Sequence, residues 1–308
     1  MRVGVIIDSA CDLPPEFIEK EQIQVLPINL YLGEEQALDV RDPGETIAFY
    51  QRFAAKKWRA ATEPPSVEQV TETLLERAAT QFDRLLIVTI SSTRSGIFEN
   101  VTKAQLPLLN AVRQKRNREG IKGSFFLRVH DSKTLFTGQA VLVHEMVRLL
   151  REEGLGFDEL CRRADVLSGN IRAFLVPEDL YFVRKRASKK GESSISWLRY
   201  QTGTLLDIRP VIRAHRGETE AVVTARGFER ALGKLLDMAA EAVEQGLKTN
   251  TIAMSYAGDP QRMWRHPLVR RFVDHALSHG IEVLQSVMST TAGVHVGPGA
   301  FSLAYAAD

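Results

Sequence analysis

The sequence predicts an α/β protein of two domains, a mostly parallel sheet covered by helices followed by an α+β domain with a mixed sheet. The chain has 308 residues, which is long enough for two domains with a core each. In the first half, apolar strand-like runs alternate with helical patterns, which favours a parallel sheet. In the second half, Asp207–Ala214 and Glu218–Ala225 are joined by His215-Arg216-Gly217, a hairpin pattern.

The first half opens with Val3–Ile7, an apolar run typical of a buried strand. Pro27 removes one ladder donor from the next strand, Val25–Leu32, so this strand lies at an edge or begins there. Arg59–Val67 is predicted to be a loop that ends in a capping box, with Ser66 as the N-cap and Gln69 three residues later. The other predicted elements are helices at Pro15–Glu21, Thr46–Phe53 and Val67–Ala78, a strand at Leu85–Ile90, a helix from Ile97, a strand at Ser124–Val129, an amphipathic helix with Ala140, Val143, Val147 and Leu150, and a helix from Phe157 to Leu167.

We place the domain boundary near residues 165–170, in the turn Ser168-Gly169-Asn170, and the predicted domains are residues 1–166 and 167–308. Its hairpin is followed by a long amphipathic helix, Phe228–Val243, whose apolar residues recur at helical spacing. The other predicted elements are the strands Ile171–Val176, Asn250–Tyr256, Ile281–Met288 and Phe301–Ala306 and the helix Pro267–His279.

The composition is that of an ordinary soluble globular protein, with 44% hydrophobic and 25% charged residues. A formal net charge of +2 provides no global field for nucleic acid, so no nucleic-acid partner is expected. The two cysteines, Cys11 and Cys161, form no CxxC motif, and no Cys/His cluster has metal-ligand spacing, so no metal site is expected. We expect a cytoplasmic protein, because we find no signal-peptide pattern and no apolar run of membrane-spanning length.

The stretch Leu85–Val101 places hydroxyl groups at the end of a predicted buried strand. In open α/β sheets, ligands bind outside the carboxyl ends of strands, where the N–H groups of the next helix attract an anion. Gly96 allows a tight turn before that helix. Ser and Thr are also the usual caps at such positions, so capping and binding are equally favoured for the cluster. The hydroxyl residues are Ser91, Ser92, Thr93 and Ser95.

A second candidate is the segment Gly293–Phe301, GVHVGPGAF. Three glycines and Pro298 within seven residues predict a rigid turn that brings the backbone close to another group. His295 lies inside this predicted turn, where an imidazole can bind an anion or act as an acid or base. A lone His in a tight turn is, however, more often structural.

Familiar catalytic and nucleotide-binding motifs do not occur in the sequence. There is no GxSxG elbow, and the spacing of Asp8, Asp131 and His295 does not indicate a triad with a loop serine. There is no GxxxxGK[ST] motif and no GxGxxG motif after the first strand. Arg184–Lys190 carries five positive charges in seven residues, which suits an anionic membrane surface or an acidic partner, although a solvated loop is the simpler interpretation.

Segments along nearly the whole chain resemble, in order, those of one family. ATEPPS is similar to a TSQPS loop, and ISSTRSGIFENV resembles an SSxxSGTYxSA signature. The other matching segments are VGVIIDSACDLP, VLPINLYLGEE followed by Asp39, VHDSKTLFTGQAVLV, IRAFLVPEDLYFVRK, LLDIRPVI and GVHVGPGAFSLAY. These segments resemble the DegV family of fatty-acid-binding proteins. Their order and spread, rather than any single motif, carry the resemblance.

The resemblance implies an N-terminal three-layer α/β/α domain and a C-terminal α+β domain that closes over the chain of a long-chain fatty acid. It implies that this chain presents the carboxylate to a separate kinase subunit, which binds ATP and makes the acyl phosphate. The chain would then have no catalytic residues and no cofactor. Ser92 is favoured over Ser95 for the carboxylate contact. The implied ligand-binding residues are Thr62, Ser92, Ser95, Gly96, His295 and Arg172.

Two departures from the family pattern bear on partners and ligand. LYFVRKRASKKGES replaces an LxYLxKGGR run, and the longer basic segment slightly favours docking of a membrane or a kinase there. EPPS in place of SQPS removes one hydroxyl from the lip of the pocket. Two other functions stay open: a serine-dependent acyl hydrolase or transferase that uses a loop serine and His295, and a lipid-regulated interaction protein without metabolic transfer.

Overall fold

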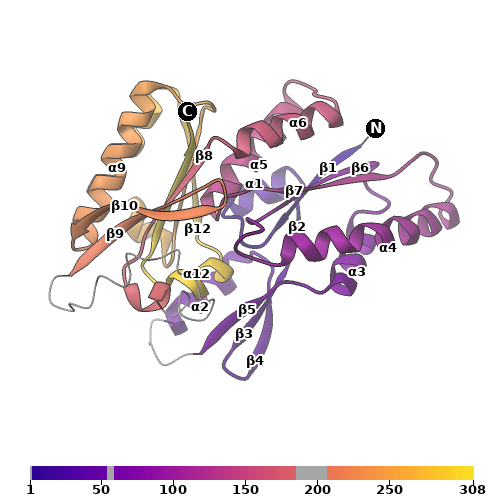
Figure 1. The fold of residues 1–308 in the computed structure, drawn as a ribbon, viewed down its shortest axis with the longest axis horizontal. Helices are drawn as coiled ribbons and strands as arrows, with labels where there is room; N and C mark the ends of the chain where they lie inside the picture. The colour runs from indigo at the N-terminus through magenta and orange to yellow at the C-terminus, as the bar shows by residue number, and fades with distance from the viewer. Residues whose placement is uncertain (1, 54–58, 185–206) are drawn as a thin grey trace.

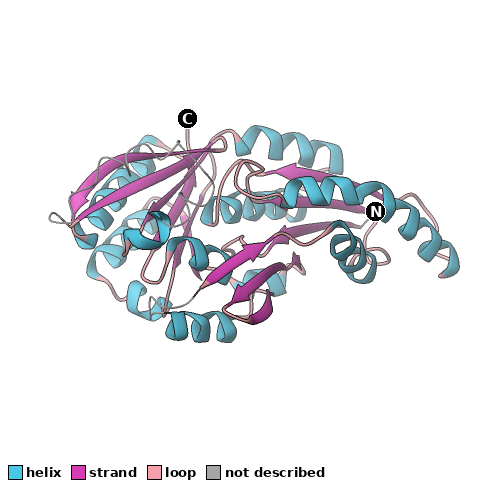
Figure 2. Ribbon diagram, turned by 60° about the horizontal axis from the view of Figure 1, so that its bottom comes forward, coloured by secondary structure: helices cyan, strands magenta, loops and turns pink. Residues whose placement is uncertain are grey.

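The computed structural model describes residues 2–53, 59–184 and 207–308. These residues form sheets of four, six and three strands. Figure 1 shows the four-stranded sheet of the first half on the right and the six-stranded sheet of the second half on the left, and Figure 2 shows helices packed along both. No helix among the described residues is long and apolar enough to cross a membrane.

The N-terminal sheet has the strand order β2-β1-β6-β7, and all of its pairs are parallel, as predicted. Side chains such as Ile6 and Ile87 pack against the helices on one face, and Ile7 and Val88 pack against those on the other. The alternation produces the three-layer α/β/α arrangement, because both faces of the central strands β1 and β6 are apolar. The strands are Val3–Asp8 (β1), Gln24–Leu26 (β2), Arg84–Thr89 (β6) and Phe126–Asp131 (β7). The helices are Pro15–Lys20 (α1), Val67–Arg77 (α3), Ile97–Arg118 (α4), Thr137–Arg151 (α5) and Phe157–Ser168 (α6).

The stretch predicted as one strand, Val25–Leu32, is two strands in different sheets. Strand β2 of the N-terminal sheet ends at Leu26, and Pro27 interrupts the ladder. Ile28–Leu32 (β3) then forms the middle strand of an antiparallel sheet with the order β4-β3-β5. The prediction of a loop over Arg59–Val67 is wrong at its start, because Ala60–Glu63 (β5) pairs with β3. The hydrophobic pattern missed this sheet because Glu35–Asp39 (β4) is almost wholly exposed and β5 is short. Helix α2 (Pro43–Phe53) lies between them in the chain.

The C-terminal sheet is mixed, as predicted, with the order β10-β9-β8-β13-β11-β12. Among the described strands of this sheet, only the β11–β12 pair is parallel. The predicted hairpin is confirmed: β9 and β10 are antiparallel, and Arg216 and Gly217 have positive φ in their turn. The strands are Ile171–Val176 (β8), Ile208–His215 (β9), Glu218–Arg226 (β10), Thr251–Tyr256 (β11), Glu282–Val287 (β12) and Phe301–Ala306 (β13). Helices α9 (Phe228–Gln245) and α11 (Pro267–Ser278) pack against one face, and α10 (Pro260–Trp264) precedes α11.

Helix α5 lies between the two large sheets. The predicted amphipathic pattern understates its burial, since every residue from Thr137 to Val147 is buried. It packs against β1 and β6 on one side and against β8, β11 and β13 on the other. The second sheet presents small side chains to α5, which lets the sheet approach the helix closely. These side chains are Ala173, Ala214, Ala253, Ala304 and Ala306.

His295 lies on a helix rather than inside the predicted turn. The Ser289 side chain caps helix α12 (Thr290–Val296) by accepting a hydrogen bond from the N–H of Ala292. The turn follows the helix, with φ values of 83° at Gly297 and 80° at Gly299. The glycine pattern therefore predicted the turn at Gly297–Gly299, but the helix that begins at the Ser289 cap includes Gly293 and His295 and ends only at Val296.

Candidate ligand-binding site

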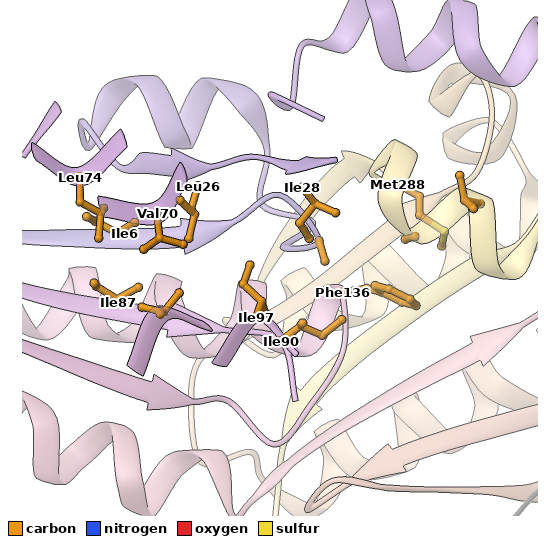
Figure 3. Packing of buried hydrophobic residues seen from close by; sticks show 14 of the residues in the cluster. Ile6, Leu26, Ile28, Val70, Leu74, Ile87, Ile90, Ile97, Phe136 and Met288 are labelled. Atoms are coloured by element: carbon orange, nitrogen blue, oxygen red, sulfur yellow. The ribbon is translucent and has the colours of Figure 1, made fainter. Parts of the chain in front are cut away.

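A cavity of about 300 Å³ is lined by residues from both halves of the molecule. Figure 3 shows Ile28, Ile90 and Phe136 near the point where the two halves meet. The wall is mostly apolar, and a few polar groups interrupt it, as is usual in small-molecule sites. The apolar lining residues are Ala10, Ile28, Pro64, Ile90, Leu135, Phe136, Leu175, Val183, Ile212 and Val296. The others are Thr62, Arg94, Ser95, Gly96, Thr219, Thr291 and His295.

Thr62 and His295 meet in the lining of this cavity. Thr62 Oγ1 and His295 Nε2 are 2.9 Å apart and share a hydrogen bond. Thr62 is on β5, opposite Leu30 of β3, and His295 is on the last turn of α12. The unpredicted three-stranded sheet therefore carries Thr62 to the histidine. When the imidazole donates this bond, the Thr62 hydroxyl keeps its own hydrogen and can donate it to a carboxylate without adding a fixed charge.

Two buried carboxylates hold the start of α12. Asp12 Oδ1 accepts a hydrogen bond from the Ser289 N–H at 2.9 Å. Asp39 Oδ2 accepts bonds from the N–H of Thr291 at 2.8 Å and from its hydroxyl at 2.7 Å. The pKa of Asp12 is raised above its usual value, because the effect of burial outweighs that of the nearby Arg41 guanidinium, which lowers it. The position of His295 thus depends on side chains from the first half of the chain.

The hydroxyl loop after β6 is bound to its surroundings at nearly every residue. Ser91 and Thr93 have their hydroxyl oxygens 3.0 Å apart, and Thr93 donates to the Gly217 carbonyl at 2.6 Å. The Ser92 hydroxyl donates to Asp131 Oδ2 at 2.5 Å, and its N–H donates to Oδ1 at 3.1 Å. These bonds direct three of the four hydroxyls away from the cavity and toward the protein.

Ser95 is the hydroxyl residue of this loop that lines the cavity. Its Oγ accepts a hydrogen bond from the Ile97 N–H at 3.3 Å. A hydroxyl that accepts in this way keeps its own hydrogen for a second partner, so it can donate to a bound anion. Gly96 follows it as the N-cap of α4, whose N-terminus carries a partial positive charge.

A buried carboxylate, Asp8, binds the backbone at the start of this loop. Asp8 Oδ2 accepts a hydrogen bond from the Ile90 N–H at 2.6 Å, and Oδ1 accepts one from the Ala10 N–H at 3.0 Å. Burial raises the pKa of Asp8 to about 6, although these bonds and one from Gln139 act in the opposite direction. Ile90 and Ala10 both line the cavity, so this carboxylate fixes part of the apolar wall.

The comparisons with known proteins agree with this architecture. The model of one family, described as an uncharacterised protein of the DegV family, matches residues 2–308. The chain belongs to the DegV family. A DegV domain-containing protein of Xanthomonas campestris is 38% identical over 309 residues, which cover 100% of this chain and 98% of that protein.

More distant relatives have names that refer to ligands. A fatty acid-binding protein of Thermotoga maritima is 24% identical, with 97% of this chain and 96% of that protein covered. A stearic acid-binding protein structure from Eubacterium ventriosum has a TM-score of 0.78 at 22% identity and covers 99% of this chain and 98% of its own. The Streptococcus pneumoniae fatty acid kinase B3 protein, loaded with linoleic acid, has a TM-score of 0.74 at 18% identity, and both chains are covered fully, at 100%. At these identities the two structures establish the DegV fold.

The cavity of this DegV protein contains four of the six ligand-binding residues expected from the sequence. Those four are Thr62, Ser95, Gly96 and His295. Ser92, the favoured serine, is not among the described lining residues, because Asp131 binds both its hydroxyl and its N–H. Arg172 is not among them either, since it lies opposite Tyr305 in the sheet and donates to the carbonyl of Asp308.

The sequence reasoning missed three polar lining residues: Arg94, Thr219 and Thr291. Arg94 stands within the hydroxyl loop itself, and its charge among uncharged loop residues is the signal by which it could have been found. Thr291 belongs to the stretch before His295, and only the fold shows that it faces the cavity. Thr219 comes from the hairpin, where nothing in the sequence marks it.

Other features are less suited to a ligand. A larger cleft of about 1140 Å³ lies beside β2 and α1, but none of the expected ligand-binding residues lines it. Among the described residues, no group of three or more His, Cys, Asp or Glu side chains is arranged to hold a metal ion. The basic run Arg184–Lys190 lies outside the described residues after Arg184.

Proposed function

We propose that this DegV protein binds a long-chain fatty acid in the cavity between its halves, with the carboxylate at Thr62, Ser95, Gly96 and His295. The observation that carries the proposal is the Thr62–His295 hydrogen bond in the wall of a mostly apolar cavity. The names of the Thermotoga and Eubacterium relatives support the same ligand class.

The energetics suit such a ligand. Burying an alkyl chain contributes about 0.8 kcal/mol for each CH₂ group, so the apolar wall supplies most of the affinity. A buried carboxylate is costly unless donors compensate for lost water. The hydroxyls of Thr62 and Ser95, the imidazole of His295 and the N-terminus of α4 offer that compensation.

The bound carboxylate is then presented to a separate, ATP-binding kinase subunit, which forms the acyl phosphate. Support for this step comes from the fold shared with the Streptococcus pneumoniae fatty acid kinase B3 protein. In this proposal the chain is a non-catalytic binding subunit. An acyl phosphate trapped as the hydroxamate, formed only when this protein, a fatty acid, ATP and such a kinase subunit are all present, would support the step.

Binding is tested by mass spectrometry of lipid extracted from the purified protein, followed by titration of the delipidated protein with fatty acid. We expect a co-purified long-chain fatty acid and saturable binding. The variant His295→Ala should bind at least tenfold more weakly at an unchanged melting temperature, because it removes a donor to a charged group. Neither co-purified nor added fatty acid bound to the folded wild-type protein would refute the proposal. Turnover of acyl esters that is lost in Ser95→Ala would instead favour a hydrolase or transferase.

A further inference from the structure

The hairpin of β9 and β10 closes one side of the cavity. Ile212 of β9 and Thr219 of β10 line it. Among the described strands, β10 pairs with β9 alone, and β9 is joined to β8 through three residue pairs. Every residue of β10 is exposed or only partly buried. A strand at the edge of a sheet, with few buried contacts, opens at a lower cost in free energy than a core strand.

Two side chains fix the tip of this hairpin to its own half of the molecule. Arg216 Nε donates to the Gly169 carbonyl at 2.9 Å, and His215 Nδ1 lies 2.8 Å from the carbonyl oxygen of Ile171. These contacts hold the start of the turn. The next residue, Gly217, therefore has a defined position at the end of the hairpin.

Gly217 connects the tip to two loops of the first half. Its N–H donates to the Lys133 carbonyl at 2.7 Å, and its carbonyl accepts from the Thr93 hydroxyl at 2.6 Å. Lys133 belongs to the loop after β7, which also supplies Leu135 to the cavity wall. Thr93 belongs to the loop after β6, which supplies Ser95. Both polar backbone groups of one residue thus bind across the junction of the two halves.

The approach of the tip to Thr93 is close enough to require glycine. Gly217 has a φ of 83°, a conformation in which other residues are strained, and a Cβ there would lie 3.2 Å from Thr93 Cγ2. Thr93 itself is not among the described residues that line the cavity. Its bond to Gly217 can therefore be removed by mutation without removing a contact to the ligand.

Other parts of the described wall are packed more firmly. Ala10, Ile28 and Ile90 are buried in the first half. Helix α5, which follows Phe136, is enclosed between the two large sheets. Buried carboxylates hold the start of α12, which carries His295. The contact between the hairpin tip and the two loops is thus a place where the wall can part without unpacking a core.

We propose that Gly217 closes the cavity as a clasp, and that a fatty acid enters and leaves when its bonds to Thr93 and Lys133 break. The inference rests on the proposed fatty-acid binding and adds the route of exchange. Each hydrogen bond between neutral groups contributes modestly to stability, so the open form is accessible as a minor state of the folded protein. Opening of such a lid can limit the rate at which a ligand is released.

The first test is a stopped-flow measurement of the binding and release of cis-parinaric acid, a fluorescent long-chain fatty acid, by delipidated protein. Thr93→Val removes one bond of the clasp and keeps the shape of the side chain. We expect the association and dissociation rate constants to rise together by about 2- to 10-fold, the value of one neutral hydrogen bond, at an unchanged Kd. Easier opening speeds entry and exit equally, whereas a lost ligand contact would speed dissociation alone.

Ser92→Ala is the matched control. It removes a hydroxyl from the same loop, but the bond of that hydroxyl to Asp131 stays within the first half. Both rate constants should remain those of the wild type. Unchanged rates in Thr93→Val, or faster dissociation alone, would overturn the proposal.

The second test locks the clasp with a disulfide in the double variant Thr93→Cys, Gly217→Cys. The 3.2 Å approach at this contact is suited to the short Cβ separation of a disulfide. The natural residues Cys11 and Cys161 are buried, so they do not compete for oxidation. The oxidised variant should exchange bound for added fatty acid far more slowly than the same protein reduced with dithiothreitol.

Equal exchange rates in the two redox states would overturn the proposal. Gly217→Cys strains the turn, so the Thr93→Val rates decide the question independently should the double variant not fold. A wild-type protein that binds no fatty acid contradicts the proposed function, and the clasp falls with it. A wild-type protein that binds fatty acid, with no effect of Thr93→Val on either rate, contradicts the clasp alone.

Discussion

At the scale of single residues, the site depends on groups that are far apart in the sequence. Thr62 and His295 are 233 positions apart, yet their side chains share a hydrogen bond. The loop after β6 shows the opposite case, because Ser92 and Ser95 are near neighbours with different surroundings. Ser92 is bound to Asp131, whereas Ser95 lines the cavity. Hydroxyls in one loop thus have different roles according to the direction in which the backbone turns them.

This difference predicts distinct effects of two matched substitutions. Ser95→Ala should weaken fatty-acid binding by about 1.5–3 kcal/mol, since it removes a donor to a carboxylate. Ser92→Ala should leave the affinity within a factor of two, because Ser92 lies outside the cavity lining. Isothermal titration with one fatty acid measures both. A stronger effect at Ser92 than at Ser95 would show that the sequence-based preference for Ser92 was right.

At the scale of elements, helix α12 positions His295 in the cavity wall. Tyr50 packs against it from α2, with its hydroxyl oxygen 3.0 Å from the carbonyl oxygens of both Met288 and Ser289. The close approach requires Gly293, because a Cβ there would lie 2.4 Å from the Tyr50 hydroxyl oxygen. A helix that contains a glycine at this position can therefore lie against the tyrosine ring.

Replacing Gly293 with alanine should destabilise the protein by about 1–3 kcal/mol, the usual cost of overpacking. It should also weaken fatty-acid binding, since the clash displaces the helix that holds His295. Gly233→Ala in α9 is the matched control, because its Cβ would meet Leu268 at an ordinary 3.7 Å. A helical Gly→Ala change without a clash is expected to stabilise the protein by up to about 1 kcal/mol. Urea denaturation of both variants checks these signs, and equal effects would rule out the Tyr50 contact as the cause.

At the scale of the whole molecule, the two halves are joined by α5 and by a buried polar cluster. Arg41 donates through Nη2 to the Leu13 carbonyl, to Ser286 Oγ and to the Val287 carbonyl, at 3.0, 3.1 and 3.2 Å. Its Nη1 lies 3.9 Å from Asp12 Oδ1, and both side chains are almost completely buried. Asp12 in turn accepts from Ser255 on β11. The cluster thus connects the loop after β1 to the strands of the second sheet.

Arg41→Met should lower the free energy of unfolding by about 3–5 kcal/mol, because it leaves the buried Asp12 carboxylate without its cation. Lys103→Met, which breaks an exposed pair with Glu99, should cost less than about 1 kcal/mol. Guanidinium-induced unfolding followed by far-UV circular dichroism measures both changes. Similar losses in the two variants would mean that the Asp12–Arg41 pair contributes no more than a surface pair.

The sequence by itself predicted the features that local physics encodes. Strands such as β1 and β6 followed from apolar β-branched runs, the start of α3 from the Ser66–Gln69 capping box, and the β9–β10 hairpin from its turn residues. The parallel first sheet and the mixed second sheet followed from the order of these elements. The loops that line the cavity were located because hydroxyls gather at the end of a predicted strand and glycines gather around His295, a pattern that fits capping and turns as well as binding.

Only the tertiary structure decided which side chains meet. It divided the strand at Pro27 between two sheets, and it buried α5 on nearly all sides although its pattern suggested one apolar face. It turned Ser95 rather than Ser92 to the cavity and added Arg94 to the wall. The reason is that periodicity and caps depend on neighbours within a few residues. The direction of a loop side chain depends on partners such as Asp131 and Thr219, which folding brings from distant parts of the chain.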